Sequence, residues 1–278
     1  MKSDHIAILM ATYNGEKYLR EQIDSLLSQS FEAWHLYIHD DGSTDTTISL
    51  LNEYSERWPE KISILNYPSY GSACKNFLSL VDRVDAEYYM FCDQDDIWLK
   101  DKIKIELNKI KEIESEFPDK PVIINTDLTV TDASLNVIHP SFWRYANIKH
   151  TFVKSFKDFA AINVATGCTM LFNKSAKLCI HKPYDKAIMH DAWLTLSVVA
   201  CGGVFFSIDK PTILYRQHGE NTLGARDAKK LTLCFRLKTF HQIIKNNIAH
   251  YQQMNAIGSI SIAEYLYAKF RHVFFKEK

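Results

Sequence analysis

The sequence predicts an α/β fold in which a mostly parallel central sheet is flanked by helices and followed by a C-terminal helical extension. Three observations support this prediction. The first half of the chain alternates short β-rich runs with amphipathic helical segments, which is the order of βαβ units. Polar clusters directly follow several of the predicted strands. From residue 226 onward the composition becomes basic, with apolar residues interleaved at helical spacing.

Short apolar runs bounded by turn residues predict strands in the first half at residues 6–11, 36–39, 62–65, 88–92 and 122–125. The segments between them have apolar residues at helical spacing and predict helices at residues 16–29, 46–58, 73–84 and 100–116. The second half is less regular, with strands expected at residues 167–172, 203–208 and 212–216 and a helix at 191–201. We expect residues 1–225 to form the main domain, in halves 1–120 and 121–225, and residues 226–278 a basic amphipathic tail broken near Gly258.

The composition excludes several classes of protein. With 278 residues, of which 46% are hydrophobic, the chain can bury a large core. Its 33 basic and 33 acidic residues balance, so no overall charge favours a nucleic-acid partner. The six cysteines form no CxxC pair and lie mostly among apolar residues, which indicates reduced core thiols. No apolar run resembles a signal peptide or a membrane span. We therefore expect a cytoplasmic protein.

The run YYMFCDQDDIW at residues 88–98 delivers three closely spaced carboxylates, Asp93, Asp95 and Asp96, to the end of an apolar strand. Their charges repel one another unless a cation or a donor-rich ligand lies between them. A hard divalent ion that carries a diphosphate is a natural partner, because such ions leave coordination sites free for phosphate oxygens. An alternative for Asp96 is that it caps the following helix.

Parallel strands with crossover helices place their ligand site at the carboxyl ends of the strands. This rule gathers residues 12–14, 40–41 and 93–96 on one edge of the sheet. There Tyr13 could stack on a nucleobase, and Asp40 could accept a hydrogen bond from a base imino group. Asp41 is expected to shape its loop. The start of the third helix, which includes Lys75, could receive anionic or polar ligand groups, although a lone lysine is more often solvated.

Four segments, ATYNGEKYL, DDGSTD, GSACKNF and FCDQDDIW, together resemble the inverting family-two glycosyltransferases of the GT-A fold, in order and spacing, over roughly the first 220 residues. DQDDIW and YRQHGENTLG resemble the rhamnosyltransferase-like subgroup. One departure is Ala11, which stands where the family often has a proline, and it affects only the stiffness of the turn.

The resemblance implies a nucleotide-sugar-binding half at 1–120 and an acceptor-binding half at 121–225. It places in the nucleotide-sugar pocket Ala11, Thr12, Tyr13, Asn14, Glu16, Asp40, Lys75, Asn76, Asp93 and Gln94. It implies a divalent metal, Mn²⁺ or Mg²⁺, held by Asp95, Asp93 and His218, although a lone histidine such as His218 is equally often structural.

Inverting transfer is a single displacement that needs a carboxylate to take the acceptor proton. The resemblance points to Asp191 in MHDAWL; the alternative is that Asp191 only caps its helix. We assign the acceptor side to Gly167, Cys168, His190 and Trp193, although tryptophans such as Trp193 are often buried. The implied donor is dTDP-rhamnose or a UDP-sugar. The implied acceptor is a glycan of a bacterial surface polysaccharide, of a kind commonly carried on a membrane lipid.

Two other functions and three roles of the tail stay open. A strand followed by DxD also occurs in haloacid-dehalogenase-like phosphatases, but there it lies near the start of the chain. A non-catalytic sugar-binding relative would keep the pocket without transfer. The tail could pack on the catalytic domain, form a homodimer, or rest on anionic lipid as a peripheral contact at the inner face of the plasma membrane.

Overall fold

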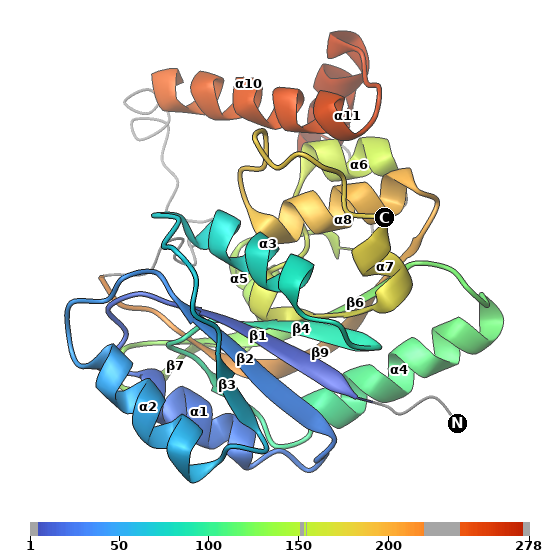
Figure 1. The fold of residues 1–278 in the computed structure, drawn as a ribbon. Helices are drawn as coiled ribbons and strands as arrows, with labels where there is room; N and C mark the ends of the chain where they lie inside the picture. The colour runs from blue at the N-terminus through green and yellow to red at the C-terminus, as the bar shows by residue number, and fades with distance from the viewer. Residues whose placement is uncertain (1–4, 151–152, 154, 220–239, 275–278) are drawn as a thin grey trace.

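The computed structural model describes residues 5–150, 153, 155–219 and 240–274. Its centre is a nine-stranded sheet in the order β3-β2-β1-β4-β8-β6-β9-β5, with β7 paired to β6 (Figure 1). The strands are β1 (Ile6–Thr12), β2 (Trp34–Asp40), β3 (Ile62–Ile64), β4 (Tyr88–Cys92), β5 (Ile97–Trp98), β6 (Val122–Thr131), β7 (Val137–His139), β8 (Met170–Asn173) and β9 (Val204–Arg216). The predicted α/β fold is confirmed.

Helices cover both faces of the sheet (Figure 1). They are α1 (Leu19–Leu27), α2 (Thr47–Arg57), α3 (Ala73–Arg83), α4 (Lys102–Glu116), α5 (Phe142–Tyr145), α6 (Phe156–Ala161), α7 (Lys174–Leu178), α8 (His190–Ala200), α10 (Phe240–Ile257) and α11 (Ile262–Phe274). A short 3-10 helix, η2 (Gly167–Thr169), precedes β8. All nine helical and strand segments predicted in the first half are present, with shifted ends.

Side-chain alternation along β1 explains the two layers of the core. Ile6, Ile8 and Met10 pack toward α1, α2 and α4, whereas Ala7 and Leu9 pack toward α3 and α8. All five are fully buried. A strand that is covered on both faces reads as a continuous apolar run, and IAILMA is such a run.

The sheet is mostly parallel: β1 to β4 run parallel to one another, and β6 and β9 also pair in parallel. Thr12 lies opposite Asp40, and Met10 lies opposite Cys92. The carboxyl ends of β2, β1 and β4 therefore meet at one edge, as predicted. In the second half, β8 runs antiparallel to both β4 and β6, so the whole sheet is mixed. The two strands predicted at 203–208 and 212–216 are one irregular strand, β9.

The C-terminal helices are part of the globular unit. Helix α10 packs on α6 and α8, and α11 packs on α6 (Figure 1). Together they bury a third apolar cluster, which contains Phe159, Val164, Leu196, Met254, Ile260, Tyr265 and Ala268. The predicted break near Gly258 separates the two helices. The beginning of the predicted tail, including Arg226, lies outside the described residues. In the described part of the chain, no helix has the length and apolarity needed to span a bilayer.

Candidate active site

Gln94 joins the two loops that follow β1 and β4. Its side-chain Oε1 accepts the main-chain N–H of Tyr13 at 2.9 Å, and its Nε2 donates to the Tyr13 carbonyl at 3.0 Å. A Cβ atom at Gly15 would lie 2.5 Å from Gln94 Oε1, so this approach requires glycine. Tyr13 itself is 57% exposed, which leaves it accessible at the edge of the sheet.

Asp40 organises its own loop. Its carboxylate accepts hydrogen bonds from Thr12 Oγ1 at 2.8 Å, Ser43 Oγ at 2.6 Å, and the main-chain N–H groups of Gly42 at 3.0 Å and Ser43 at 2.7 Å. A carboxylate has about four acceptor positions, and these donors use them. Recognition of a base by Asp40 would therefore have to replace one of these bonds. A cavity of about 170 Å³ lies beside it, lined also by His39, Leu51 and Tyr67.

Asn14 and Glu16 bind the neighbouring DGSTD loop. Asn14 Oδ1 accepts the N–H of Thr44 at 2.9 Å, and Glu16 Oε2 accepts the N–H and the hydroxyl of Thr46 at 2.9 and 2.7 Å. Asn14 has a φ of 47°, a left-handed conformation that asparagine tolerates. The side chains of Asn14 and Glu16, both predicted to line the nucleotide pocket, thus hold two loops together in this structure.

Asn76 and Lys75, the two predicted pocket residues on α3, lie in different environments. Asn76 is 1% exposed; its Oδ1 lies 2.8 Å from His39 Nδ1, and its Nδ2 donates to the His39 carbonyl at 3.2 Å. It fastens α3 to the end of β2 and is enclosed by protein, contrary to the surface position that ligand binding needs. Lys75 is exposed. Ala11 is half-buried at the end of β1.

Asp95 follows β4 and His218 follows β9, and their side chains meet although they are far apart in the sequence. Asp95 Oδ2 lies 2.8 Å from His218 Nε2, and 15% and 10% of the two side chains are exposed. Behind them, Asp93, Asp96 and Cys168 place one potential ligand atom each within 4.8 Å of one another. Asp96 is fully buried and accepts the N–H of Arg216 at 3.0 Å, so it caps no helix.

The carboxyl of Asp93 interacts electrostatically with Asp95, in the same loop, and with Asp191 on α8. Its pKa is raised to about 7, mainly by burial and then by the negative charges of Asp95 and Asp191. Burial, with the charges of Asp95 and Asp93, also raises the pKa of Asp96. Burial, and then the charges of Asp96 and Asp93, raise the pKa of the Cys168 thiol, which is fully buried. Cys168 was predicted on the acceptor side but is inaccessible in this structure.

Asp191 lies in the first turn of α8, and the residue that caps this helix is Met189. Its Oδ2 accepts the N–H of Gly167 at 3.1 Å, and its Oδ1 accepts the N–H of Ala192 at 2.6 Å. Burial raises its pKa to about 6, and these two hydrogen bonds act in the opposite direction. The carboxyl of Asp191 is therefore fixed by two hydrogen bonds, and its pKa is raised toward neutral pH.

The residues beside Asp191 lie in the buried core of the protein. His190 is 4% exposed and stacks on Phe77 with ring centroids 4.1 Å apart, and burial lowers its pKa to about 3. A Cβ atom at Gly167 would lie 2.5 Å from His190 Nε2. Trp193 is fully buried, and its indole N–H donates to the His181 carbonyl at 2.9 Å. His190 and Trp193 were predicted to meet the acceptor, but the packing of α8 against α3 and the sheet encloses both.

Comparison with known proteins identifies the family. The model named "Glycosyl transferase family 2" matches residues 7–178, well over half of the chain. This chain belongs to glycosyl transferase family 2. A relative from Shigella flexneri, dTDP-rhamnosyl transferase RfbG, is 32% identical over 78% of this chain and 74% of its own length. The putative teichuronic acid biosynthesis glycosyltransferase TuaG of Bacillus subtilis is 31% identical over 38% of this chain and 42% of its own.

Solved structures show that the fold is GT-A. The mannosyltransferase PcManGT from Pyrobaculum calidifontis, in complex with GDP-Man and Mn²⁺, matches with a TM-score of 0.62 at 13% identity, covering 97% of this chain and 70% of that chain. S. aureus TarS 1-349 in complex with UDP-GlcNAc matches with a TM-score of 0.59 at 14% identity, covering 97% and 71%. As a member of family 2, the protein is a glycosyltransferase.

The donor atoms in this family 2 site fit a hard divalent cation. The predicted ligands Asp95, Asp93 and His218 would offer two carboxylates and an imidazole nitrogen, a set that suits Mn²⁺ and, less well, Mg²⁺. Asp95 and His218 meet in the structure, whereas the atoms of Asp93 that could bind a metal group with those of Asp96 and Cys168. Burial and the nearby charges of Asp95 and Asp191 raise the pKa of Asp93, and a bound cation would favour its ionised form. Cys168 fits less well, because its thiol is a soft ligand and burial raises its pKa. Asp96 uses only Oδ1 to accept the N–H of Arg216, and its buried Oδ2, which has no hydrogen-bond partner among the described residues, is left for a cation.

Arg216 and Tyr18 are two residues of this site that were not predicted. Arg216 contacts both Asp95 and Asp96, and the Tyr18 ring lies 4.7 Å from the ring of His218. The one available signal for Arg216 was a charged residue at the end of the apolar strand ILYR. Tyr18 stood in a helical stripe of apolar residues, where its position predicted only packing.

Proposed function

We propose that this family 2 glycosyltransferase transfers rhamnose from dTDP-rhamnose to a hydroxyl of a glycan acceptor, with inversion and with a divalent cation, in bacterial surface polysaccharide synthesis. One observation carries the proposal. Asp93 lies close enough to both Asp95 and Asp191 for their charges to add to the effect of burial, which together raise the pKa of Asp93 to about 7. The choice of rhamnose draws on the similarity to RfbG across 78% of the chain.

On the donor side, Asp95, Asp93 and His218 would hold Mn²⁺ or Mg²⁺. The bound cation would supply charge neutralisation for the departing diphosphate. Tyr13 offers an exposed ring on which the base could stack, next to the loop that Gln94 fastens. The cavity beside Asp40 is a second place where the base could be recognised.

On the acceptor side, Asp191 would act as the general base. The acceptor oxygen attacks the anomeric carbon, the bond from that carbon to the diphosphate oxygen breaks, and the acceptor proton passes to Asp191. A pKa of about 6 leaves Asp191 ionised at neutral pH while it binds a proton more strongly than an exposed aspartate does. The hydrogen bonds from Gly167 and Ala192 keep the carboxylate in place.

The phosphatase alternative loses its support, because the DxD residues follow β4 inside a family 2 domain rather than the first strand of the chain. The non-catalytic alternative makes a different prediction about turnover. An active transferase releases nucleoside diphosphate slowly from its donor even without acceptor, whereas an inert binder releases none.

The deciding experiment presents dTDP-rhamnose, UDP-GlcNAc and GDP-mannose to the purified protein with Mn²⁺, with Mg²⁺ and with a chelator. We expect thermal stabilisation and nucleoside diphosphate release with dTDP-rhamnose, and loss of both in chelator. Stabilisation and release by another donor, with none from dTDP-rhamnose, would refute the rhamnose assignment. Full release in chelator would refute the metal assignment.

A further inference from the structure

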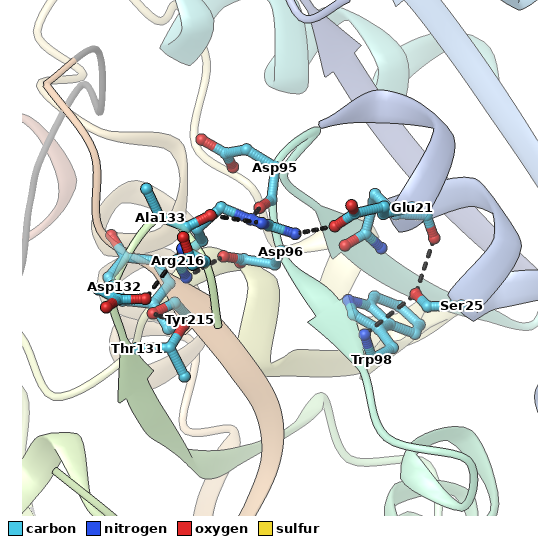
Figure 2. A network of polar contacts seen from close by, with 12 residues as sticks. Glu21, Ser25, Asp95, Asp96, Trp98, Thr131, Asp132, Ala133, Tyr215 and Arg216 are labelled. Atoms are coloured by element: carbon cyan, nitrogen blue, oxygen red, sulfur yellow. Dashed lines mark hydrogen bonds and ion pairs between the residues drawn. The ribbon is translucent and has the colours of Figure 1, made fainter. Parts of the chain in front are cut away.

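Arg216, at the end of β9, has a guanidinium group that is enclosed by several separate segments of the chain (Figure 2). The residue is 2% exposed. Its Nε donates to the main-chain carbonyl of Asp95 at 2.9 Å, its Nη1 donates to the carbonyl of Ala133 at 2.8 Å, and its Nη2 pairs with the carboxylate of Glu21. A buried cation is costly unless its donors are matched in this way.

Two further contacts complete this arrangement. The main-chain N–H of Arg216 donates to Asp96 Oδ1 at 3.0 Å, and the guanidinium carbon lies 4.4 Å from the centre of the Tyr18 ring. Arg216 therefore joins the first turn of α1, the DQDD loop and the turn after β6 (Figure 2). These segments are distant in sequence: they follow β1, β4 and β6, respectively.

Arg216 and His218 both contact Asp95. Arg216 holds the main chain of Asp95 through its carbonyl, and His218 lies 2.8 Å from the side chain of the same residue. A single residue separates Arg216 from His218, so the anchored main chain of Arg216 limits where the imidazole can lie. The main chain and the side chain of Asp95 are thus both set from the end of β9.

We infer that Arg216 is a positioning residue that holds Asp95 and His218 in the arrangement needed to bind the cation and the diphosphate. This inference rests on the proposed function. Arg216 is too deeply buried to touch the donor, so it acts through Asp95 and His218. Lysine cannot replace it, because one ammonium group does not reproduce the planar fork that reaches Asp95, Ala133 and Glu21 at once.

The test compares Arg216→Lys and Arg216→Met with the matched control Glu21→Gln in the full-length protein. Arg216→Met keeps the aliphatic bulk of the side chain and places no charge in the core. With two different replacements, the comparison can still be made if one of them fails to fold. Glu21→Gln weakens only the outer ion pair, since 56% of the Glu21 side chain is exposed, and it leaves the contact with Asp95 intact. Two quantities are measured: amide hydrogen exchange of residues 93–98 without metal, and the dissociation constant of Mn²⁺.

We expect faster exchange at residues 93–98 and about 10- to 100-fold weaker Mn²⁺ binding in both Arg216 variants, the usual effect of losing a residue that orients metal ligands. Glu21→Gln should change both quantities by less than about threefold. A purely structural role would lower the melting temperature and leave the Mn²⁺ constant unchanged, which would overturn the inference. Unchanged exchange in a folded Arg216 variant would overturn it as well. If the wild-type protein binds no Mn²⁺, the metal proposal fails, and the exchange measurement alone decides the role of Arg216.

Discussion

Asp191 is buried at the start of α8 and lies close enough to Asp93 for their charges to interact. Its raised pKa of about 6 means that it is protonated in acid and ionised at neutral pH. Only the ionised form can accept a proton, so we expect the transfer rate to fall about tenfold per pH unit below about pH 6 and to level off above it. Initial rates across this range test the prediction, provided that donor binding is measured at each pH.

The variant Asp191→Asn should remove the pH dependence together with the activity. Its side-chain oxygen can still accept the N–H of Gly167, so the fold and donor binding should persist. We expect transfer to fall about 10²- to 10⁴-fold, the usual contribution of a general base. Thermal stabilisation by dTDP gives the control for folding. Transfer within a factor of about ten of wild type would exclude Asp191 as the base.

Asp95 permits a complementary prediction on the donor side. Its side chain is partly exposed and lies 2.8 Å from His218, so Asp95→Ala should abolish the part of dTDP binding that depends on Mn²⁺. Calorimetric titration with and without the ion measures this difference. The matched control is Asp101→Ala, an exposed aspartate whose side chain accepts from Ser30 and lies outside the cluster. An equal loss in both variants would point to a general effect of charge.

Among the elements, α3 is attached to the sheet by polar contacts as well as by apolar packing. Asn76 bonds both the side chain and the carbonyl of His39, so Asn76→Ala should leave buried partners without hydrogen bonds. We expect it to lower the free energy of unfolding by about 1–3 kcal/mol. Denaturant titration measures this, with the exposed neighbour Lys75→Ala expected to stay within about 0.5 kcal/mol of wild type. Comparable losses in the two variants would contradict the fastening role of Asn76.

The elements also show which parts of the structure were predictable. The strands could be placed because a strand covered on both faces needs an unbroken apolar run, which depends only on local sequence. The environment of a side chain depends on distant contacts. Asn76 was predicted to bind the nucleotide sugar, but in the structure it hydrogen-bonds to His39. Trp193 was predicted to contact the acceptor, but it is buried between α8 and its neighbours. Asp95 and His218 were predicted to act together and do meet, since both follow strands whose ends share one edge.

Over the whole molecule, the C-terminal helices pack against α6 and α8 rather than standing apart from the rest of the fold. The Gln253 side chain of α10 accepts the N–H of Ile188 at 2.9 Å, in the segment that leads directly into α8 and Asp191. Gln253 and Met254 are buried by 99% or more, and Met254 packs in the cluster with Leu196 of α8. A chain cut before α10 would therefore expose core, and point substitutions test this region more cleanly.

Two positions on α10 provide a matched comparison. Met254 is 1% exposed and Ile248 is 53% exposed. Met254→Ala should lower the free energy of unfolding by about 2–5 kcal/mol, because it leaves a cavity between α10 and α8. Ile248→Ala should change it by no more than about 0.5 kcal/mol, because its side chain already contacts solvent. Chemical denaturation of both variants measures the difference. If Met254→Ala had the same free energy of unfolding as wild type, α10 would not be part of the core. Its contact with the segment before Asp191 would then not stabilise the fold.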